Sequence, residues 1–116
     1  VTCKKNVGIA EDVKFELISV NKKDKKVFIN LDITNQQSWP LDFAAITLIR
    51  VKNEINMQGQ IDPYKGKNTV KYGIENGETI GVELVYNFDA PPNSVTILCK
   101  PSIKIVSDSV MYALNF

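Results

Sequence analysis

Few residues of this chain have the chemistry that catalysis requires. The 116 residues include no His, which excludes Ser-His and Cys-His nucleophilic catalysis and metal ligation by imidazole. The acidic residues are scattered, and their spacing does not predict the carboxylate pair of a glycoside hydrolase. No run resembles a calcium-binding loop, and no glycine-rich phosphate-binding motif is present. We therefore expect a non-catalytic protein without a catalytic residue, a metal site or a cofactor.

Three aromatic side chains are the best candidates for contact with a ligand. Trp39 stands in a Gln-Gln-Ser-Trp-Pro-Leu segment, Tyr64 in a polar loop, and Phe28 on the polar face of its predicted strand. Trp and Tyr give a large contact area at a small cost in conformational entropy, and loops are the usual binding surface of a rigid fold. Trp39, Tyr64 and Phe28 are thus the predicted binding surface. Two alternatives stay open: Trp39 folds back to plug the core, and Phe28 packs under a neighbouring loop or subunit.

The two cysteines, Cys3 and Cys99, stand near opposite ends of the chain. A disulfide between them would close almost the whole chain into a ring, worth up to ~4.5 kcal/mol in the loop-entropy model. We expect this disulfide, because the rest of the composition also suits a secreted domain. One alternative is two unrelated thiols, with Cys99 a small core residue. Another alternative is a lipid-anchored Cys3. Such a cysteine is expected to follow a small residue, and the residue before Cys3 is instead Thr2.

Charge and hydropathy restrict the partners and the location. The chain has 14 basic and 13 acidic residues and a net charge of +1, so it has no field that would hold a nucleic acid. We interpret the basic cluster at residues 22–26 as a solvated hairpin tip, with a phosphate or acidic-surface patch as the alternative. No stretch approaches the ~20 apolar residues of a membrane span. Because Val1 comes first, we expect a processed chain from which a signal or an anchor has been removed.

The elements that must position these residues are strands, because hydrophobic residues recur with a period of two. Residues 22–26 would join the first two strands, and Asn76-Gly77 and the proline-containing segment 89–93 supply further turns. The 44–51 run is apolar on both faces, which is typical of a strand covered on two sides. The predicted strands are residues 13–18, 27–34, 44–51, 70–75, 82–88, 95–99, 103–105 and 110–116.

This pattern predicts an all-β fold. No long segment has a helical period with caps, so at most one helical turn is expected. About seven to eight short strands with turns between them predict an antiparallel β-sandwich rather than an α/β protein. The length fits a single domain over residues 1–116, in which residues 1–11 are an N-terminal extension.

Three stretches also match the pattern of a known family in order and spacing. They are a strand that ends in Asn and is followed by Pro-Leu, a Gly-Glu-Thr turn that leads into a strand, and a Phe-Asp-x-Pro exit from that strand. On these segments the chain resembles the immunoglobulin-like domains of unknown function found in bacterial surface lipoproteins. The segments are residues 27–35 with 39–41, 77–79 with 82–88, and 88–91.

The resemblance covers roughly residues 12–100. Asn76 stands where that family often has a proline, and the extension at 103–116 lies outside the match. The resemblance implies an immunoglobulin-like sandwich in the cell envelope, often lipid-tethered and without assigned catalytic residues. It carries no site residues over to this chain.

We expect a non-catalytic interaction domain of an exported or cell-surface bacterial protein. It would contact a protein or an envelope polymer through a loop end or a sheet edge, and residues 110–116 could pair two copies into a weak homodimer. The alternative function is a carbohydrate-binding β-sandwich module, for which Trp39 and Tyr64 are the available aromatic residues. No nucleic-acid partner is expected, and a lipid anchor outside this chain is compatible with this interpretation.

Overall fold

The protein folds into antiparallel strands with one short helix. The computed structural model describes the backbone of residues 2–104 and 108–116, and the side chains of residues 7–104 and 108–116. The helix α1 is a single turn, Ala45–Leu48. The strands are β1 (Thr2–Ala10), β2 (Val13–Lys23), β3 (Lys26–Asn35), β4 (Leu41–Ala44), β5 (Ile49–Asn53), β6 (Gln60–Ile61), β7 (Val70–Ile74), β8 (Thr79–Asn87), β9 (Ser94–Cys99) and β10 (Val110–Asn115).

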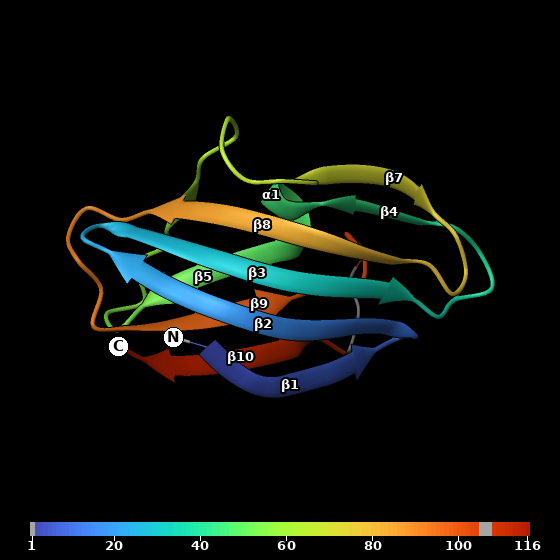
Figure 1. Cartoon of the computed structure of the whole chain (residues 1–116), viewed down its shortest axis with the longest axis horizontal. Coiled ribbons are helices and arrows are strands. Elements are labelled where there is room, and N and C mark those ends of the chain that lie inside the picture. The colour runs from blue at the N-terminus through green and yellow to red at the C-terminus, as the bar shows by residue number, and fades with distance from the viewer. Residues whose placement is uncertain (1, 105–107) are drawn as a thin grey trace.

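The strands form two layers with a small flanking sheet (Figure 1). One layer is a five-stranded sheet in the order β1-β2-β3-β8-β6, and the other is a three-stranded sheet in the order β10-β9-β5. The two-stranded sheet β4-β7 lies beside β8 at one end of the molecule. All of these pairings are antiparallel, so the prediction of an all-β antiparallel fold is confirmed.

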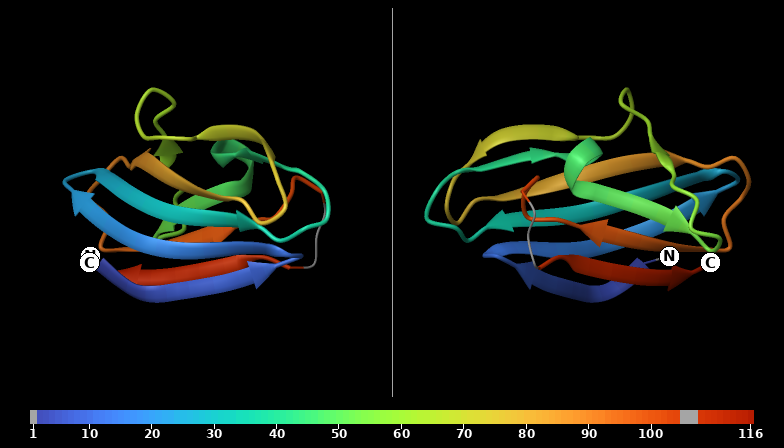
Figure 2. Two further views of the ribbon diagram at one scale, coloured as in Figure 1. Left: turned by 45° about the vertical axis from the view of Figure 1, so that its right-hand side comes forward. Right: turned by 180° about the vertical axis from the view of Figure 1, so that it is seen from behind.

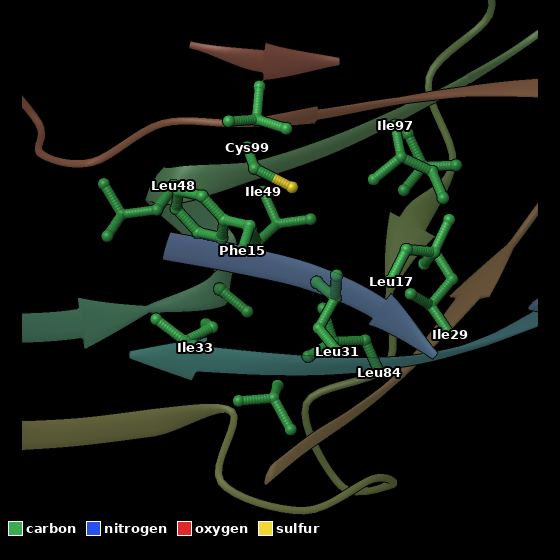
Figure 3. Packing of buried hydrophobic residues seen from close by; sticks show 14 of the residues in the cluster. Phe15, Leu17, Ile29, Leu31, Ile33, Leu48, Ile49, Leu84, Ile97 and Cys99 are labelled. Carbon is green, nitrogen blue, oxygen red and sulfur yellow. The ribbon is translucent and has the colours of Figure 1, made fainter. Parts of the chain in front are cut away.

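The core lies between the two layers and follows the predicted alternation. Along β3 the burial alternates at every residue, with Val27, Ile29, Leu31 and Ile33 at most 1% exposed. Figure 3 shows side chains of β2 and β3 meeting those of β9 in this core. Removing this apolar surface from water stabilises the fold by roughly 25 cal/mol per Å².

Two tyrosines join the layers by hydrogen bonds. The Tyr86 hydroxyl, on β8, donates to the carbonyl oxygen of Ile49 at 3.3 Å. In the opposite direction, the Tyr112 hydroxyl, on β10, donates to the carbonyl oxygen of Phe15 on β2 at 3.0 Å. Burial raises the pKa of both phenols well above the usual value, so both remain protonated donors.

The N-terminal segment is a strand and not an extension. Residues 2–10 form β1 and pair with β2, from Ala10↔Val13 to Thr2↔Ser19. β1 also runs beside β10 in both views of Figure 2, and Gly8 faces Val110 so closely that a Cβ at Gly8 would collide with it. The edge of β10 that we expected to be open to a second copy is therefore flanked by β1. In the described part of this strand the exposed residues, Val7 and Ile9, are apolar and the inward ones, Gly8 and Ala10, are small, so hydropathy does not mark the buried face.

The predicted strand at 44–51 is interrupted by α1. Ala45 and Leu48 are buried while Ile46 is 71% exposed, which is the burial pattern of one helical turn. The Thr47 hydroxyl donates to the carbonyl oxygen of Ala44 at 3.1 Å, which satisfies one backbone group at this break. The other predicted strand that the structure alters is 103–105: residues 103 and 104 lie outside any strand, and residue 105 lies outside the described part.

The predicted disulfide is wrong, because Cys99 is a free and fully buried thiol. Cys99 pairs with Val110 on β10, and Val110 packs against Gly8. Cys99 is thus the small core residue of the alternative interpretation, and burial raises its pKa to about 12. The Cys3 side chain lies outside the described residues.

Candidate binding groove

An open groove of about 930 Å³ lies on the surface of the described residues, and we call it the Trp39 groove. It lies at the end of the molecule where the β1–β2 turn, the β3–β4 loop and the segment after β9 come together. Its volume is within the range of small-ligand sites in proteins. Its lining consists of residues 11–12, Gln37, residues 39–42, Ala44, Thr47, Tyr72 and residues 101–104.

A buried asparagine fixes the backbone that carries Trp39. Asn35 ends β3 and is completely buried. Its Nδ2 donates to the carbonyl oxygens of Ile74 at 2.7 Å and Trp39 at 2.8 Å, and its Oδ1 accepts the Gln37 N–H at 2.9 Å. Because both the nitrogen and the oxygen of the Asn35 side-chain amide are hydrogen-bonded, the β3–β4 loop is held in one conformation. Trp39 is 65% exposed, so it does not plug the core.

The β1–β2 turn is tied to the same loop. The carbonyl oxygen of Asp12 accepts the Gln36 N–H at 2.8 Å, and that of Glu11 accepts from Gln37 Nε2 at 3.3 Å. Glu11 and Asp12 both have positive φ, 46° and 62°. Two such residues between paired Ala10 and Val13 make a two-residue hairpin turn of the type that usually contains glycine. Both acidic side chains are exposed at the groove.

Tyr72 reaches the groove because β7 is irregular. The register of β4 and β7 shifts between Leu41 and Phe43, and Gly73 has a φ of +70°. The Gly73 N–H bonds to Asp42 Oδ1 at 2.9 Å. An extra residue in one strand reverses the alternation, so Ile74 is buried while Tyr72 is 68% exposed. The period of two predicted for the strand at residues 70–75 would place Tyr72 and Ile74 on one face, and this part of the prediction is wrong.

The groove has an acidic lining with aromatic walls. Glu11, Asp12 and Asp42 contribute three carboxylates, and Lys104 contributes the one ammonium group of the lining. The described residues contain no group of three or more His, Cys, Asp or Glu that could hold a metal ion. The lining includes Ser102 and Thr47 but no imidazole that would activate a hydroxyl. This arrangement suits binding by aromatic contact and carboxylate hydrogen bonds.

The structure separates the three predicted binding residues. Trp39 lies in the groove, whereas Tyr64 stands 95% exposed in the β6–β7 loop. Phe28 is half-buried and shares a second hollow of about 440 Å³ with Lys65 and Gly66. Phe28 therefore lies apart from Trp39, and it borders a hollow on the face where the β6–β7 loop passes. The aromatic residue that accompanies Trp39 is Tyr72, and the glycine next to it in an otherwise regular strand pattern was the available signal.

No helix in the described part of the chain has the length and apolar character needed to cross a membrane.

The predicted hairpin tip at Lys22–Lys26 does form the turn between β2 and β3, with Lys23 paired to Lys26. The β2–β3 tip lies at the opposite end of the molecule from the β1–β2 turn, whose residues Glu11 and Asp12 line the groove (Figure 1).

Comparisons with known proteins address the fold. Neither the models of protein families nor the curated proteins include a match to this chain. Among solved structures, the chain is similar to the yjhA protein from Bacillus subtilis, with a TM-score of 0.70, 10% sequence identity, and coverage of 95% of both chains. At this identity the likeness shows a common fold over nearly the whole length.

Proposed function

We propose that this chain is a non-catalytic binding domain of an exported or cell-surface bacterial protein, and that it contacts a protein or an envelope polymer through the Trp39 groove. The observation that carries the proposal is the state of Trp39. A large aromatic side chain that is 65% exposed lies on a loop fixed by the buried Asn35. Rigid, exposed Trp and Tyr residues are the side chains that most often dominate binding energy.

The proposal includes an immunoglobulin-like topology for the two layers. The order β2-β3-β8-β6 corresponds to strands A-B-E-D of such domains, and β10-β9-β5 corresponds to G-F-C. In this assignment β1 is an added strand at the edge of the five-stranded sheet, and β4 and β7 form an additional two-stranded sheet. The loops at the ends of these sandwiches commonly bind partners, and the Trp39 groove lies at one such end.

The proposed location outside the cell rests on the resemblance of the sequence to domains of bacterial surface lipoproteins. The cysteines no longer support it, because Cys99 is a free thiol. A lipid anchor would belong to a part of the protein outside this chain. Localisation of the full-length protein by fractionation of the source bacterium tests this part of the proposal, and recovery in the cytoplasm alone would contradict it.

Substitution of Trp39 tests the function. We expect Trp39→Ala to reduce binding to an array of glycans and extracellular peptides by tenfold or more, as for a dominant contact residue, and to leave the melting temperature nearly unchanged. Tyr64→Ala is the matched control, because Tyr64 is also exposed but lies outside the groove. Equal binding by the two variants, or a drop of many degrees in the Tm of Trp39→Ala, would contradict the proposal.

A carbohydrate-binding module is the second candidate. The observation in its favour is that Trp39 and Tyr72, rather than Trp39 and Tyr64, border one groove together with the carboxylate of Asp42. Sugar rings stack on aromatic faces while carboxylates accept hydrogen bonds from hydroxyl groups. Saturable binding to oligosaccharides that is lost in both Trp39→Ala and Tyr72→Ala would select this candidate.

A further inference from the structure

We propose that the occupant of the Trp39 groove is a Lys- or Arg-bearing segment of a separate partner protein, whose cationic side chains lie between the aromatic walls and the acidic lining. This inference rests on the proposed function of the groove and adds the chemical class of the partner. It joins two independent features of the groove, its pair of exposed aromatic rings and its excess of negative charge.

The aromatic rings suit a cation. Trp39 is 65% exposed and Tyr72 is 68% exposed, and both border the groove from different elements. A Lys or Arg side chain within about 6 Å of such a ring is attracted to the negative face of its π system, and Trp is the most favourable ring. The apolar stem of the same side chain can pack on Ile103, which is 78% exposed at the groove.

The charges of the lining favour the same ligand. The carboxylates of Glu11, Asp12 and Asp42 outnumber the single ammonium group of Lys104. Charge complementarity of this kind steers association and discriminates against partners of like charge. A neutral sugar would gain from the aromatic rings but not from this excess of negative charge, so the two features together favour a basic segment.

The size of the groove indicates a peptide rather than a small cation. A groove of about 930 Å³ that extends over four segments of the chain has room for several side chains. Hydrogen bonds tie three of these segments together: Gln36 N donates to Asp12 O at 2.8 Å, and Gly73 N donates to Asp42 Oδ1 at 2.9 Å. These parts of the groove are therefore positioned before the ligand arrives, which lowers the entropy cost of binding.

Trp39 is the one tryptophan of the chain, so its fluorescence reports on the groove directly. The probes are hexalysine, hexaarginine and hexaglutamate with blocked termini, together with the hexaoses of chitin and cellulose. We expect a saturable change in Trp39 emission with hexalysine and hexaarginine, none with hexaglutamate, and a marked weakening at high salt.

Charge-neutral variants locate the site. We expect Asp12→Asn and Asp42→Asn each to weaken hexalysine binding by roughly two- to fivefold, the range of an exposed ion pair. Asp42→Asn retains an amide oxygen that can accept the Gly73 N–H bond. Asp89→Asn is the matched control, because it changes the net charge equally at an exposed position outside the groove. Equal weakening by all three variants would contradict the inference.

Other results of the probe experiments would separate a failure of the cationic partner from a failure of the proposed binding function. A response to the hexaoses alone would overturn the cationic partner and leave the binding function of the groove intact, whereas silence toward every probe would contradict both. Sedimentation should show a monomer at low salt. Concentration-dependent association that is abolished by Lys23→Glu would instead identify the occupant as the basic tip of a second copy and would overturn the assignment to a separate partner.

Discussion

At the scale of single residues, Asn35 holds the Trp39 groove in place without belonging to its lining. Asn35 is completely buried, and its side chain makes hydrogen bonds to Trp39, Gln37 and Ile74. Its backbone takes part as well, since its carbonyl oxygen accepts the Gly77 N–H at 2.6 Å. A single buried amide therefore connects the groove loop to the end of β7 and to the β7–β8 turn.

We predict that Asn35→Ala lowers the free energy of unfolding by about 2–4 kcal/mol, because it leaves buried backbone groups without partners. Asn30→Ala is the matched control: Asn30 makes a single, half-buried bond to Ser19 Oγ at 2.7 Å, so its loss should cost about 1 kcal/mol. Urea titration of the two variants checks the difference. Equal costs would mean that the network around Asn35 has no special role.

Cys99 gives the stability a dependence on alkaline pH. Burial raises its pKa to about 12, whereas an exposed thiol has an ordinary value of 9.0. A raised folded-state pKa means that the stabilising contribution is fully present below pH 9 and is lost as the pH rises toward 12, because only the unfolded state gains from ionisation.

We therefore predict that the free energy of unfolding falls between pH 9 and 12, and that Cys99→Ala makes this fall shallower by up to a few kcal/mol in total. Both proteins share the buried Tyr86 and Tyr112, whose raised pKa values act in the same direction, so the difference between them isolates the thiol. Parallel pH curves for the two proteins would show that Cys99 ionises equally well in the folded state.

At the scale of elements, β7 decides the composition of the groove. A regular strand would have buried Tyr72 together with Ile74. The left-handed Gly73, whose N–H is held by Asp42, separates their faces instead. Bulges are common next to functional sites because they redirect a side chain.

We predict that Gly73→Ala destabilises the protein by about 1–2 kcal/mol, the cost of a left-handed conformation for a residue with a Cβ atom. The cost is conformational, since a Cβ at Gly73 would meet no other atom within 4 Å. Gly81→Ala serves as the control, because a Cβ there would make ordinary contact with Asp32 Oδ1 at 3.6 Å and β8 has no left-handed residue at that point. Thermal unfolding should show little change, or a slight gain, for Gly81→Ala.

At the scale of the whole molecule, the two layers are held by the apolar core and by reciprocal tyrosine bonds. Tyr86 extends from the five-stranded sheet to β5, and Tyr112 extends from the three-stranded sheet to β2. Residues 112 and 15 lie 97 positions apart in the sequence. This bond fixes the C-terminal strand β10 to strand β2 of the N-terminal hairpin, so segments from both ends of the chain are held in the same core.

We predict that Tyr86→Phe and Tyr112→Phe each cost about 1 kcal/mol, the net worth of one hydrogen bond. The costs should add within about 0.5 kcal/mol in the double variant, because the two bonds share no partner. Denaturant unfolding followed by circular dichroism and by Trp39 fluorescence measures both quantities. Transitions that differ between the two probes would show that the layers unfold separately.

Much of the architecture was determined by the sequence, because a period of two requires strands with one buried face. The hairpin around the basic tip, the alternation of β3 and the turn at Gly77 all follow from local patterns that no distant contact overrides. The sequence also identified Trp39 as a candidate binding residue, from its polar surroundings between a strand and a proline.

Only the tertiary structure decided which residues meet. The pairing of β1 with β2, the burial of Cys99 as a free thiol, and the meeting of Trp39 with Tyr72 all depend on register and on the stacking of layers. A shift of one residue in register reverses the face of every side chain beyond it. Such a shift at Gly73 cannot be read from alternation alone, which is why the sequence predicted Tyr64 in the place that Tyr72 takes.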